Sequence, residues 1–292
     1  MIAGPTAVGK SALAVAVAER CGGEIIGADA FQIYRGLDIL TAKPLPELRA
    51  RVPHHLIGEI PLTESFDVAQ YLAGARQRIA EIHARGRPAI VVGGTGLYLR
   101  ALTHGLADLP SANPALRAIF ENQPLAELQR QLAELDPIGA TQIDLKNPRR
   151  LIRALEVCQL TGRPFSSFRE QWNTPAPNVR GVVLSLDRTA LNHRIDQRTE
   201  TMFLEGVIEE VSTCGAVSPI ASQTIGLWDI QALIAGTVSL AACIAAIQQA
   251  TRRYAKRQMT WFRRESSLQL LDVSSIDDLH SLADTLAKTV VG

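Results

Sequence analysis

Long apolar runs, clustered cysteines and a strong net charge are all missing from this sequence. No apolar run approaches the roughly 18 residues that a membrane-spanning helix needs, so we expect a cytoplasmic protein without membrane contact. The four cysteines are widely scattered and form no C-x-x-C pair, which indicates neither a zinc site nor a disulfide framework. The net charge of +1 argues against a uniformly basic nucleic-acid-binding protein, although local patches can still attract phosphate.

A complete phosphate-binding loop is present near the start of the chain. Residues 4–11 match the P-loop pattern G-x-x-x-x-G-K-S of nucleotide-binding and ATP-binding proteins. Glycines let the backbone aim several N–H groups at one phosphate, Lys10 adds a positive charge, and Ser11 offers a hydroxyl to a Mg²⁺ ion. The alanine-rich run 12–20 predicts a helix whose N-terminus holds the anion. The predicted phosphate-binding residues are Gly4, Pro5, Thr6, Ala7, Val8, Gly9, Lys10 and Ser11, with Ser11 as the metal ligand.

The strand that should lead into this loop is short. Only Met1, Ile2 and Ala3 precede the loop, whereas strands usually run for about 5–6 residues. We therefore expect that a longer N-terminus, with a few more apolar residues, would give a more stable protein.

Apolar segments without alternation indicate further buried strands at residues 24–28, 89–92, 182–186 and 268–273. Helical patterns separate them, at residues 66–84, 189–212 and 238–263 among others. Between Pro110 and Asn178 no strand pattern occurs, and helical stretches at 115–121, 125–134 and 148–161 are punctuated by prolines. The sequence thus predicts an α/β fold with a P-loop-type parallel sheet core flanked by helices. Residues 1–110 and 179–292 would form this core, and 111–178 an α-helical insertion domain.

Two polar residues follow predicted strands at the edge where ligands of such sheets collect. Asp29 is placed as a base aimed at an acceptor group, or else as a simple cap or turn residue. Thr95 follows two glycines and is either a helix cap or a hydroxyl donor to a leaving or incoming group. The strand at 89–92 ends in glycine, where Mg²⁺-dependent nucleotide hydrolases carry an aspartate. This difference favours a transferase over a motor or a switch.

Histidines and arginines supply the remaining candidates. His54 and His55 have no carboxylate or cysteine at ligand spacing, so polar packing is favoured over metal binding. Arg149, Arg150 and Arg153 form one basic cluster. Residues 251–264 form a second one, a cationic helix face beside an aromatic stripe, which is either a solvated surface or an RNA-binding surface.

Seven blocks of the sequence, in collinear order over nearly the whole chain, resemble the tRNA dimethylallyltransferase (tRNA isopentenyltransferase) family. They comprise residues 4–11, 29–34, 38–44, 52–56, 92–98, 148–157 and 254–262. The resemblance implies an enzyme that transfers the prenyl group of dimethylallyl diphosphate to the exocyclic amine of the adenosine just 3′ of the tRNA anticodon. It also implies that the P-loop holds a prenyl diphosphate, with Mg²⁺ as cofactor, and we expect the protein to be a monomer.

Carried onto this chain, the resemblance makes Asp29 the catalytic base and places Thr95 near the reacting centre. It offers Arg194 or Arg198 as a second clamp on the diphosphate. The segments that would bind the tRNA anticodon stem-loop are Asp29, Ala30, Phe31, Gln32, Thr95, Arg117, Arg149, Arg150, Leu151, Ile152, Arg153, Gln223, Thr224, Ile225, Gly226, Leu227 and Trp228.

Three positions depart from the family pattern, which usually has Ser at Ala30, Gly at Leu40 and Tyr at Leu227. None of these changes removes a charge or the base, so we expect effects on rate or RNA affinity rather than on the reaction type. Three alternatives to a tRNA prenyltransferase stay open at this point. They are a P-loop small-molecule kinase, an adenylate isopentenyltransferase, and a P-loop RNA-binding module without catalytic activity.

Overall fold

The computed structural model describes residues 1–168, 180–265, 268–274 and 279–291. The chain divides into two compact units. Met1–Leu102 together with Pro177–Gly292 form what we call the core unit, and Thr103–Ala176 form the helical unit.

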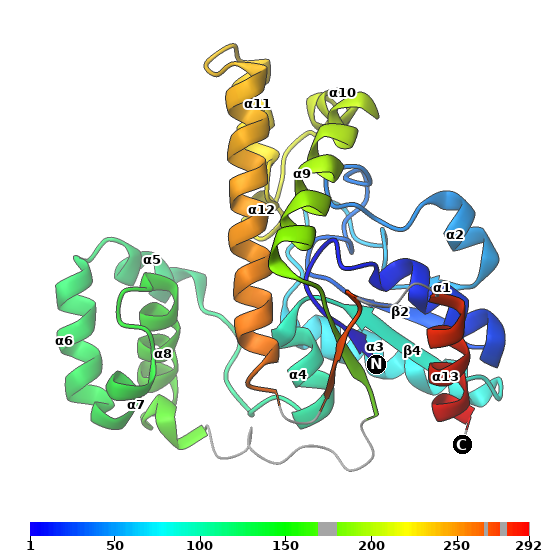
Figure 1. The fold of residues 1–292 in the computed structure, drawn as a ribbon. Coiled ribbons are helices and arrows are strands. Elements are labelled where there is room, and N and C mark those ends of the chain that lie inside the picture. The colour runs from blue at the N-terminus through cyan, green and yellow to red at the C-terminus, as the bar shows by residue number, and fades with distance from the viewer. Residues whose placement is uncertain (169–179, 266–267, 275–278, 292) are drawn as a thin grey trace. The chain divides into compact units, whose positions relative to one another are not determined.

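A parallel β-sheet organises the core unit (Figure 1). Every pairing between neighbouring strands in the described residues is parallel, and the strand order is β3-β2-β4-β1-β5-β6. The strand that leads into the phosphate loop is central although it is short, because β4 and β5 flank it on both sides. The strands are β1 (Ile2–Ala3), β2 (Glu24–Ala28), β3 (His54–His55), β4 (Ala89–Gly93), β5 (Val182–Ser185) and β6 (Gln269–Asp272). The predicted parallel sheet is confirmed.

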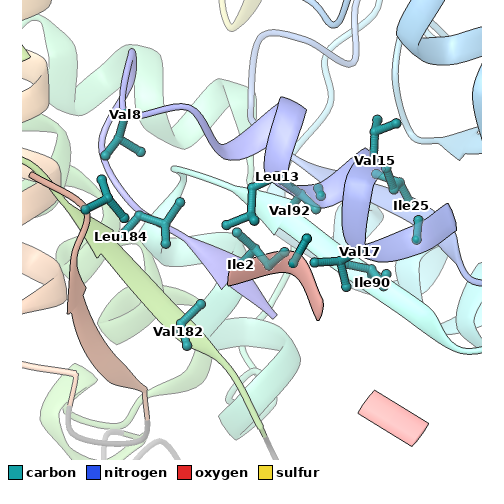
Figure 2. Packing of buried hydrophobic residues seen from close by; sticks show 14 of the residues in the cluster. Ile2, Val8, Leu13, Val15, Val17, Ile25, Ile90, Val92, Val182 and Leu184 are labelled. Carbon is teal, nitrogen blue, oxygen red and sulfur yellow. The ribbon is translucent and has the colours of Figure 1, made fainter. Parts of the chain in front are cut away.

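Both faces of this sheet are apolar, which explains why the strand sequences do not alternate. Ile25, Ile90 and Val92 face one side, where α1 (Lys10–Cys21) and α13 (Leu279–Val291) pack on them. Figure 2 shows side chains of β1, β4 and α1 pointing toward one another in this layer. Ile26 and Val91 face the other side, against α3 (Val68–Ala84) and α4 (Gly96–His104). Neighbouring residues of one strand therefore enter opposite layers of the core.

Further helices of the core unit follow the predicted segments with one interruption. The predicted helix 189–212 is two helices, because Gly206 adopts a φ of 95° that ends α9 (Arg188–Leu204) and begins α10 (Val207–Ser212). The predicted helix 238–263 is α12 (Leu240–Phe262), and it lies alongside α9 (Figure 1). The sequence patterns did not identify α2 (Pro46–Arg51), β3 or α11 (Leu227–Ile234).

The helical unit confirms the three helices expected there and adds a fourth. Its helices are α5 (Pro114–Glu121), α6 (Leu125–Leu135), α7 (Pro137–Gln142) and α8 (Pro148–Thr161). Prolines occupy the first helical position of α5, α7 and α8, where no N–H is needed, so they begin helices rather than break them. Leu128 and Leu132 of α6 pack against Leu151 and Leu155 of α8 to form the centre of its core.

A charged cluster closes the amino-terminal end of β2. The side chain of Glu24 is 3% exposed and accepts hydrogen bonds from Arg85 at 3.1 and 2.7 Å and from Arg87 at 3.3 Å. His55 Nε2 lies 2.7 Å from the same carboxylate. The Arg85 and His55 contacts outweigh the cost of burial and lower the pKa of Glu24 to about 2. His55 therefore has the polar packing role that was favoured for it.

We expect Glu24→Gln to lower the free energy of unfolding by about 2 kcal/mol at pH 7, the usual range for hydrogen bonds to a charged group. Because the folded-state pKa of Glu24 is depressed, its contribution is present above the unfolded-state pKa and is lost as the pH falls toward 2. The difference between variant and wild type should therefore shrink below about pH 4.5 in urea titrations. Glu19→Gln, in the exposed pair with Arg51, is the matched control and should have a much smaller effect. Equal losses in the two variants would contradict this account.

Candidate active site

The phosphate loop has the backbone conformation that an anion cradle needs. Gly9 at φ 101° and Ala7 at φ 65° turn the chain between β1 and α1. Gly4 is required for a different reason, because a Cβ there would lie 2.7 Å from the Leu184 carbonyl oxygen. No side chain caps the N-terminus of α1, whose first N–H groups are therefore available to a ligand.

Two cations border this cradle. Lys10 Nζ donates to the Pro5 carbonyl at 2.7 Å, and burial lowers the pKa of Lys10 to about 8. Arg198 Nη2 donates to Thr6 Oγ1 at 2.9 Å, while its buried Nε has no hydrogen-bond partner among the described residues. Burial also lowers the pKa of Arg198. Of the two arginines considered for a second clamp, Arg198 lines the cavity next to the loop, whereas Arg194 is exposed on α9.

Asp29 directly follows β2, and one of its oxygens is already occupied. Oδ1 accepts hydrogen bonds from the N–H groups of Phe31 at 3.0 Å and Gln32 at 3.3 Å. Oδ2 has no hydrogen-bond partner within the described part of the chain. The carboxylate is thus held in place by one oxygen and retains the other for a ligand.

Thr95 connects the ends of β2 and β4. Its N–H donates to the Ala28 carbonyl at 3.1 Å, and its Oγ1 accepts the N–H of Ala30 at 3.0 Å. Thr95 also begins α4, since its carbonyl accepts the N–H groups of Tyr98 and Leu99. Thr95 therefore occupies the helix-start position that was considered for it, and its role as a hydroxyl donor to a reacting group stays a prediction. Because this hydrogen bond uses the backbone N–H of residue 30, it is kept even though alanine replaces the usual serine of the family pattern at that position.

A cavity of about 60 Å³ brings these groups together within the core unit. Its polar lining includes Thr6 of the phosphate loop, Asp29, Arg198 and Tyr254. Its apolar lining is supplied by Phe31, Leu40, Met202, Ile225 and Ile247. Leu40, which stands where the family pattern usually has glycine, is thus part of the apolar wall of the cavity. One cavity therefore joins a residue of the P-loop, an arginine, a carboxylate and an apolar surface.

Sequence reasoning missed the residues of α12 that face this site. Tyr254 lines the cavity within hydrogen-bonding reach of Thr95, and burial raises its pKa. Gln258 is buried, although it was assigned only to a segment with a cationic face and an aromatic stripe. A signal existed, because Gln258 continues the buried positions Thr251, Ala255 and Phe262 at helical spacing. A polar residue in such a stripe indicates a specific partner.

The candidate RNA-binding residues of the helical unit fall into two groups. Arg117 and Arg153 both bind the fully buried carboxylate of Glu156, at 3.0 and 2.6 Å. Arg149 and Arg150, in contrast, are exposed in the first turn of α8, with no ion pair among the described residues. The side chains of Leu151 and Ile152 lie in the core of the unit. Direct side-chain contact with RNA is therefore open to Arg149 and Arg150 above all.

Part of the candidate segment 223–228 borders this cavity. Thr224 and Ile225 line the cavity, and Gly226 begins α11 with a φ of 92°. Leu227 is fully buried, whereas the indole of Trp228 is 63% exposed. The aromatic side chain available to a partner is therefore at position 228.

The second basic cluster borders a larger groove of about 780 Å³ in the core unit. The groove lies at the carboxyl ends of β5 and β6 and beside α12, and its basic lining residues are Arg188, Arg252, Arg253, Lys256 and Arg263. Arg252 is paired with Asp196 of α9. The other four have no ion pair in the residues that the structure describes. In those residues, no helix has the length and apolar character needed to cross a membrane.

Comparison with known proteins gives consistent results. The family model described as IPP transferase matches residues 32–265. A protein of Akkermansia muciniphila named tRNA dimethylallyltransferase is 42% identical over 98% of this chain and 97% of its own length. One of the same name from Geobacter sulfurreducens is 42% identical over 97% and 94%.

Solved structures agree with these sequence relatives. The full-length tRNA isopentenylpyrophosphate transferase of Bacillus halodurans has a TM-score of 0.70 at 36% identity, covering 99% of this chain and 95% of that one. A eukaryotic dimethylallyltransferase acting on tRNA has a TM-score of 0.83 at 29% identity, covering 98% and 76%. The resemblance stated from the sequence is confirmed, and the chain belongs to the IPP transferase family.

Proposed function

We propose that this protein transfers the dimethylallyl group of dimethylallyl diphosphate to the exocyclic amine of the adenosine on the 3′ side of the anticodon in tRNA. The observation that carries the proposal is one cavity of the core unit that is lined by Thr6 of the phosphate loop, by Asp29 and by apolar side chains. A diphosphate, an attacking amine and a prenyl chain require these three kinds of surface. The names of relatives that align over nearly the whole chain support the same reaction and do not favour a kinase or an adenylate-specific enzyme.

The donor half of the site stabilises the leaving group. Breaking the bond between the allylic carbon and the diphosphate oxygen leaves negative charge on the diphosphate. The N–H groups at the start of α1, Lys10 Nζ and the free Nε of Arg198 are donors fixed in place before the charge develops. The apolar wall that includes Met202 and Ile247 suits the prenyl chain and limits water near the allylic cation.

Ser11 would hold Mg²⁺ together with the diphosphate. This ion commonly takes one or two protein ligands and completes its shell with substrate phosphates and water. The hydroxyl of Ser11, half-buried in the first turn of α1, fits that mode of binding. When bound, the ion supplies positive charge that neutralises the leaving diphosphate.

The acceptor half of the site removes a proton. The adenine must leave its stack to enter the cavity, as bases do in enzymes that modify them. As the amine nitrogen bonds to the allylic carbon, Oδ2 of Asp29 accepts the amine proton. Phe31 and Gln32 hold the carboxylate through Oδ1 during this step. The Thr95 hydroxyl accepts a hydrogen bond from the backbone N–H of Ala30, the residue that follows Asp29.

The RNA partner in this proposal is the anticodon stem-loop. Arg149 and Arg150, the exposed Trp228 and the basic groove beside α12 offer phosphate and stacking contacts. We also propose that the protein acts as a cytoplasmic monomer.

The direct test is incubation of the purified protein with dimethylallyl diphosphate, Mg²⁺ and unmodified tRNA, followed by mass analysis of the nucleosides. Prenylated adenosine at the position after the anticodon is expected. AMP as a parallel acceptor separates an adenylate-specific enzyme. Binding of tRNA without any prenylated nucleoside would indicate the non-catalytic alternative.

Lys10→Ala should raise the donor KM and lower turnover, because it removes a charge from the diphosphate cradle, while tRNA binding changes little. In the wild type, the donor KM should rise as the pH increases through about 8, where free Lys10 loses its proton. Steady-state kinetics across this pH range measure both effects. Lys288→Ala, exposed on α13, is the control and should behave as wild type. Unchanged donor kinetics in Lys10→Ala would assign another ligand to the loop.

Asp29→Asn should reduce turnover by about 10²–10⁴, the usual cost of losing a positioned base. The amide oxygen can still accept from Phe31 and Gln32, so donor and tRNA affinities should change much less. Asp67→Asn is a matched control, because Asp67 caps α3 through the same pair of backbone contacts. Near-normal turnover in Asp29→Asn would assign the base elsewhere.

Replacing both Arg149 and Arg150 by glutamine should weaken tRNA binding and flatten its salt dependence, by about one counterion for each lost phosphate contact. Arg153 is left in place, because it supports the buried Glu156. Binding curves at several salt concentrations make the measurement. The control is Arg130→Gln on α6, whose side chain is already paired with Glu127 and Glu134. An unchanged salt slope in the double variant would make this helix end a merely solvated surface.

A further inference from the structure

Gln258 of α12 connects two loops that are far apart in the sequence. Its Oε1 accepts the N–H of Thr6 at 2.9 Å, and its Nε2 donates to the carbonyl of Gly94 at 2.9 Å. The residue is 6% exposed. One buried amide therefore spans the interval between the phosphate loop and the turn that follows β4.

The chemistry of these contacts calls for an amide. A backbone N–H can only donate and a backbone carbonyl can only accept, so the orientation of the Gln258 amide is fixed by its partners. A carboxylate at this position could accept from Thr6 but could not donate to Gly94. A thioether could accept only weakly from Thr6 and could not donate to Gly94, and a shorter side chain would not reach both.

The turn after β4 also fits closely against α12. A Cβ on Gly94 would lie 2.2 Å from Gln258 Nε2, and a Cβ on Gly96 would lie 2.4 Å from the ring of Trp261. Glycine is required at both positions because side chains of α12 occupy the space that a Cβ would need. The turn after β4 and α12 are therefore held together by close packing as well as by the hydrogen bond of Gln258.

Each loop held by Gln258 carries one half of the chemistry. Thr6 lines the cavity, and its hydroxyl accepts from Arg198. Gly94 precedes Thr95, whose hydroxyl holds the backbone beside Asp29. Tyr254, one turn earlier on α12, is within hydrogen-bonding reach of both Thr95 and Gln258. The amide thus links the donor half of the cavity to the acceptor half.

We propose that Gln258 is a positioning residue that fixes the separation between the diphosphate cradle and the Thr95–Asp29 end of the cavity. It acts through Thr6 and Gly94 and need not touch either substrate. The inference rests on the proposed prenyl transfer, which requires the allylic carbon and the amine to meet at a set distance. A displacement of about 1 Å between reacting groups can cost roughly 10²-fold in rate.

The experiment compares Gln258→Met with Gln248→Met, the same replacement ten residues earlier on α12, where the side chain contacts α9. Single-turnover prenyl transfer at saturating donor and tRNA is measured beside tRNA Kd and the melting temperature. We expect Gln258→Met to lower the single-turnover rate by about 10–100-fold, within the range for misplaced reacting groups. Its tRNA Kd should stay within about twofold of wild type, since the RNA-binding surfaces are unchanged. Gln248→Met should match the wild-type rate.

A second variant tests the role even if Gln258→Met folds poorly. In Gln258→Glu the ionised side chain faces the Gly94 carbonyl without a proton, whereas the protonated acid can again donate to Gly94 while accepting from Thr6. The single-turnover rate of this variant, divided by that of wild type, should therefore rise as the pH is lowered from 8 to 5.5. The other ionisable groups near this position, Lys10, Asp29, Arg198, Tyr254 and Arg257, are present in both proteins, so the ratio reports on the added carboxyl group.

The outcomes separate the two proposals. A wild-type protein without transfer activity overturns the proposed function and, with it, this inference. An active wild type with Gln258→Met as fast as Gln248→Met overturns the positioning role alone. A rate ratio for Gln258→Glu that is flat with pH also overturns it, because simple packing would not depend on the added proton.

Discussion

The close approach of β2 and β4 at their carboxyl ends is the constraint on which the site depends. A Cβ on Gly93 would lie 2.1 Å from the Ala28 carbonyl oxygen, so the two strands meet at a spacing that only glycine permits. Immediately beyond this point, the Thr95 hydroxyl takes the N–H of Ala30. Asp29 and Thr95 lie close together because each follows one of these two strand ends. Any larger residue at 93 would separate the proposed base from the rest of the cavity.

Helix α12 serves two purposes on its opposite faces. One face carries Tyr254 to the cavity, Gln258 to the two loops beside the cavity and Phe262 to the core. Its exposed positions, including Arg253, Lys256 and Arg263, border the basic groove. Because residues next to each other in a helix point in different directions, one continuous stretch of α12 supplies polar groups to the cavity on one face and positive charge on the other.

Apart from β3, the strands could be predicted from the sequence, as could the phosphate loop, because their signals are local. Residues 24–28 were placed at their observed limits, since residues 25–28 form a continuous apolar run that ends at a turn. The partner of a charged residue can lie far away in the sequence. Arg117 and Arg153 have the composition of an RNA-binding patch, yet both serve Glu156, which is 39 residues from Arg117 along the chain. Gln258 was missed for the same reason, because its two partners lie at residues 6 and 94.

The two ends of the sheet differ in how far their polar groups are satisfied. At the amino end, protein side chains surround the carboxylate of Glu24. At the carboxyl end, Asp29 Oδ2 and Arg198 Nε find no hydrogen-bond partner in the described residues. A bound ligand can supply hydrogen-bond partners to these atoms in the folded protein, so ligand binding and folding are thermodynamically linked. At a ligand concentration 100 times Kd, this linkage adds about 2.7 kcal/mol to the stability of the fold. Binding of the proposed prenyl diphosphate would then stabilise the fold as well as supply the reaction.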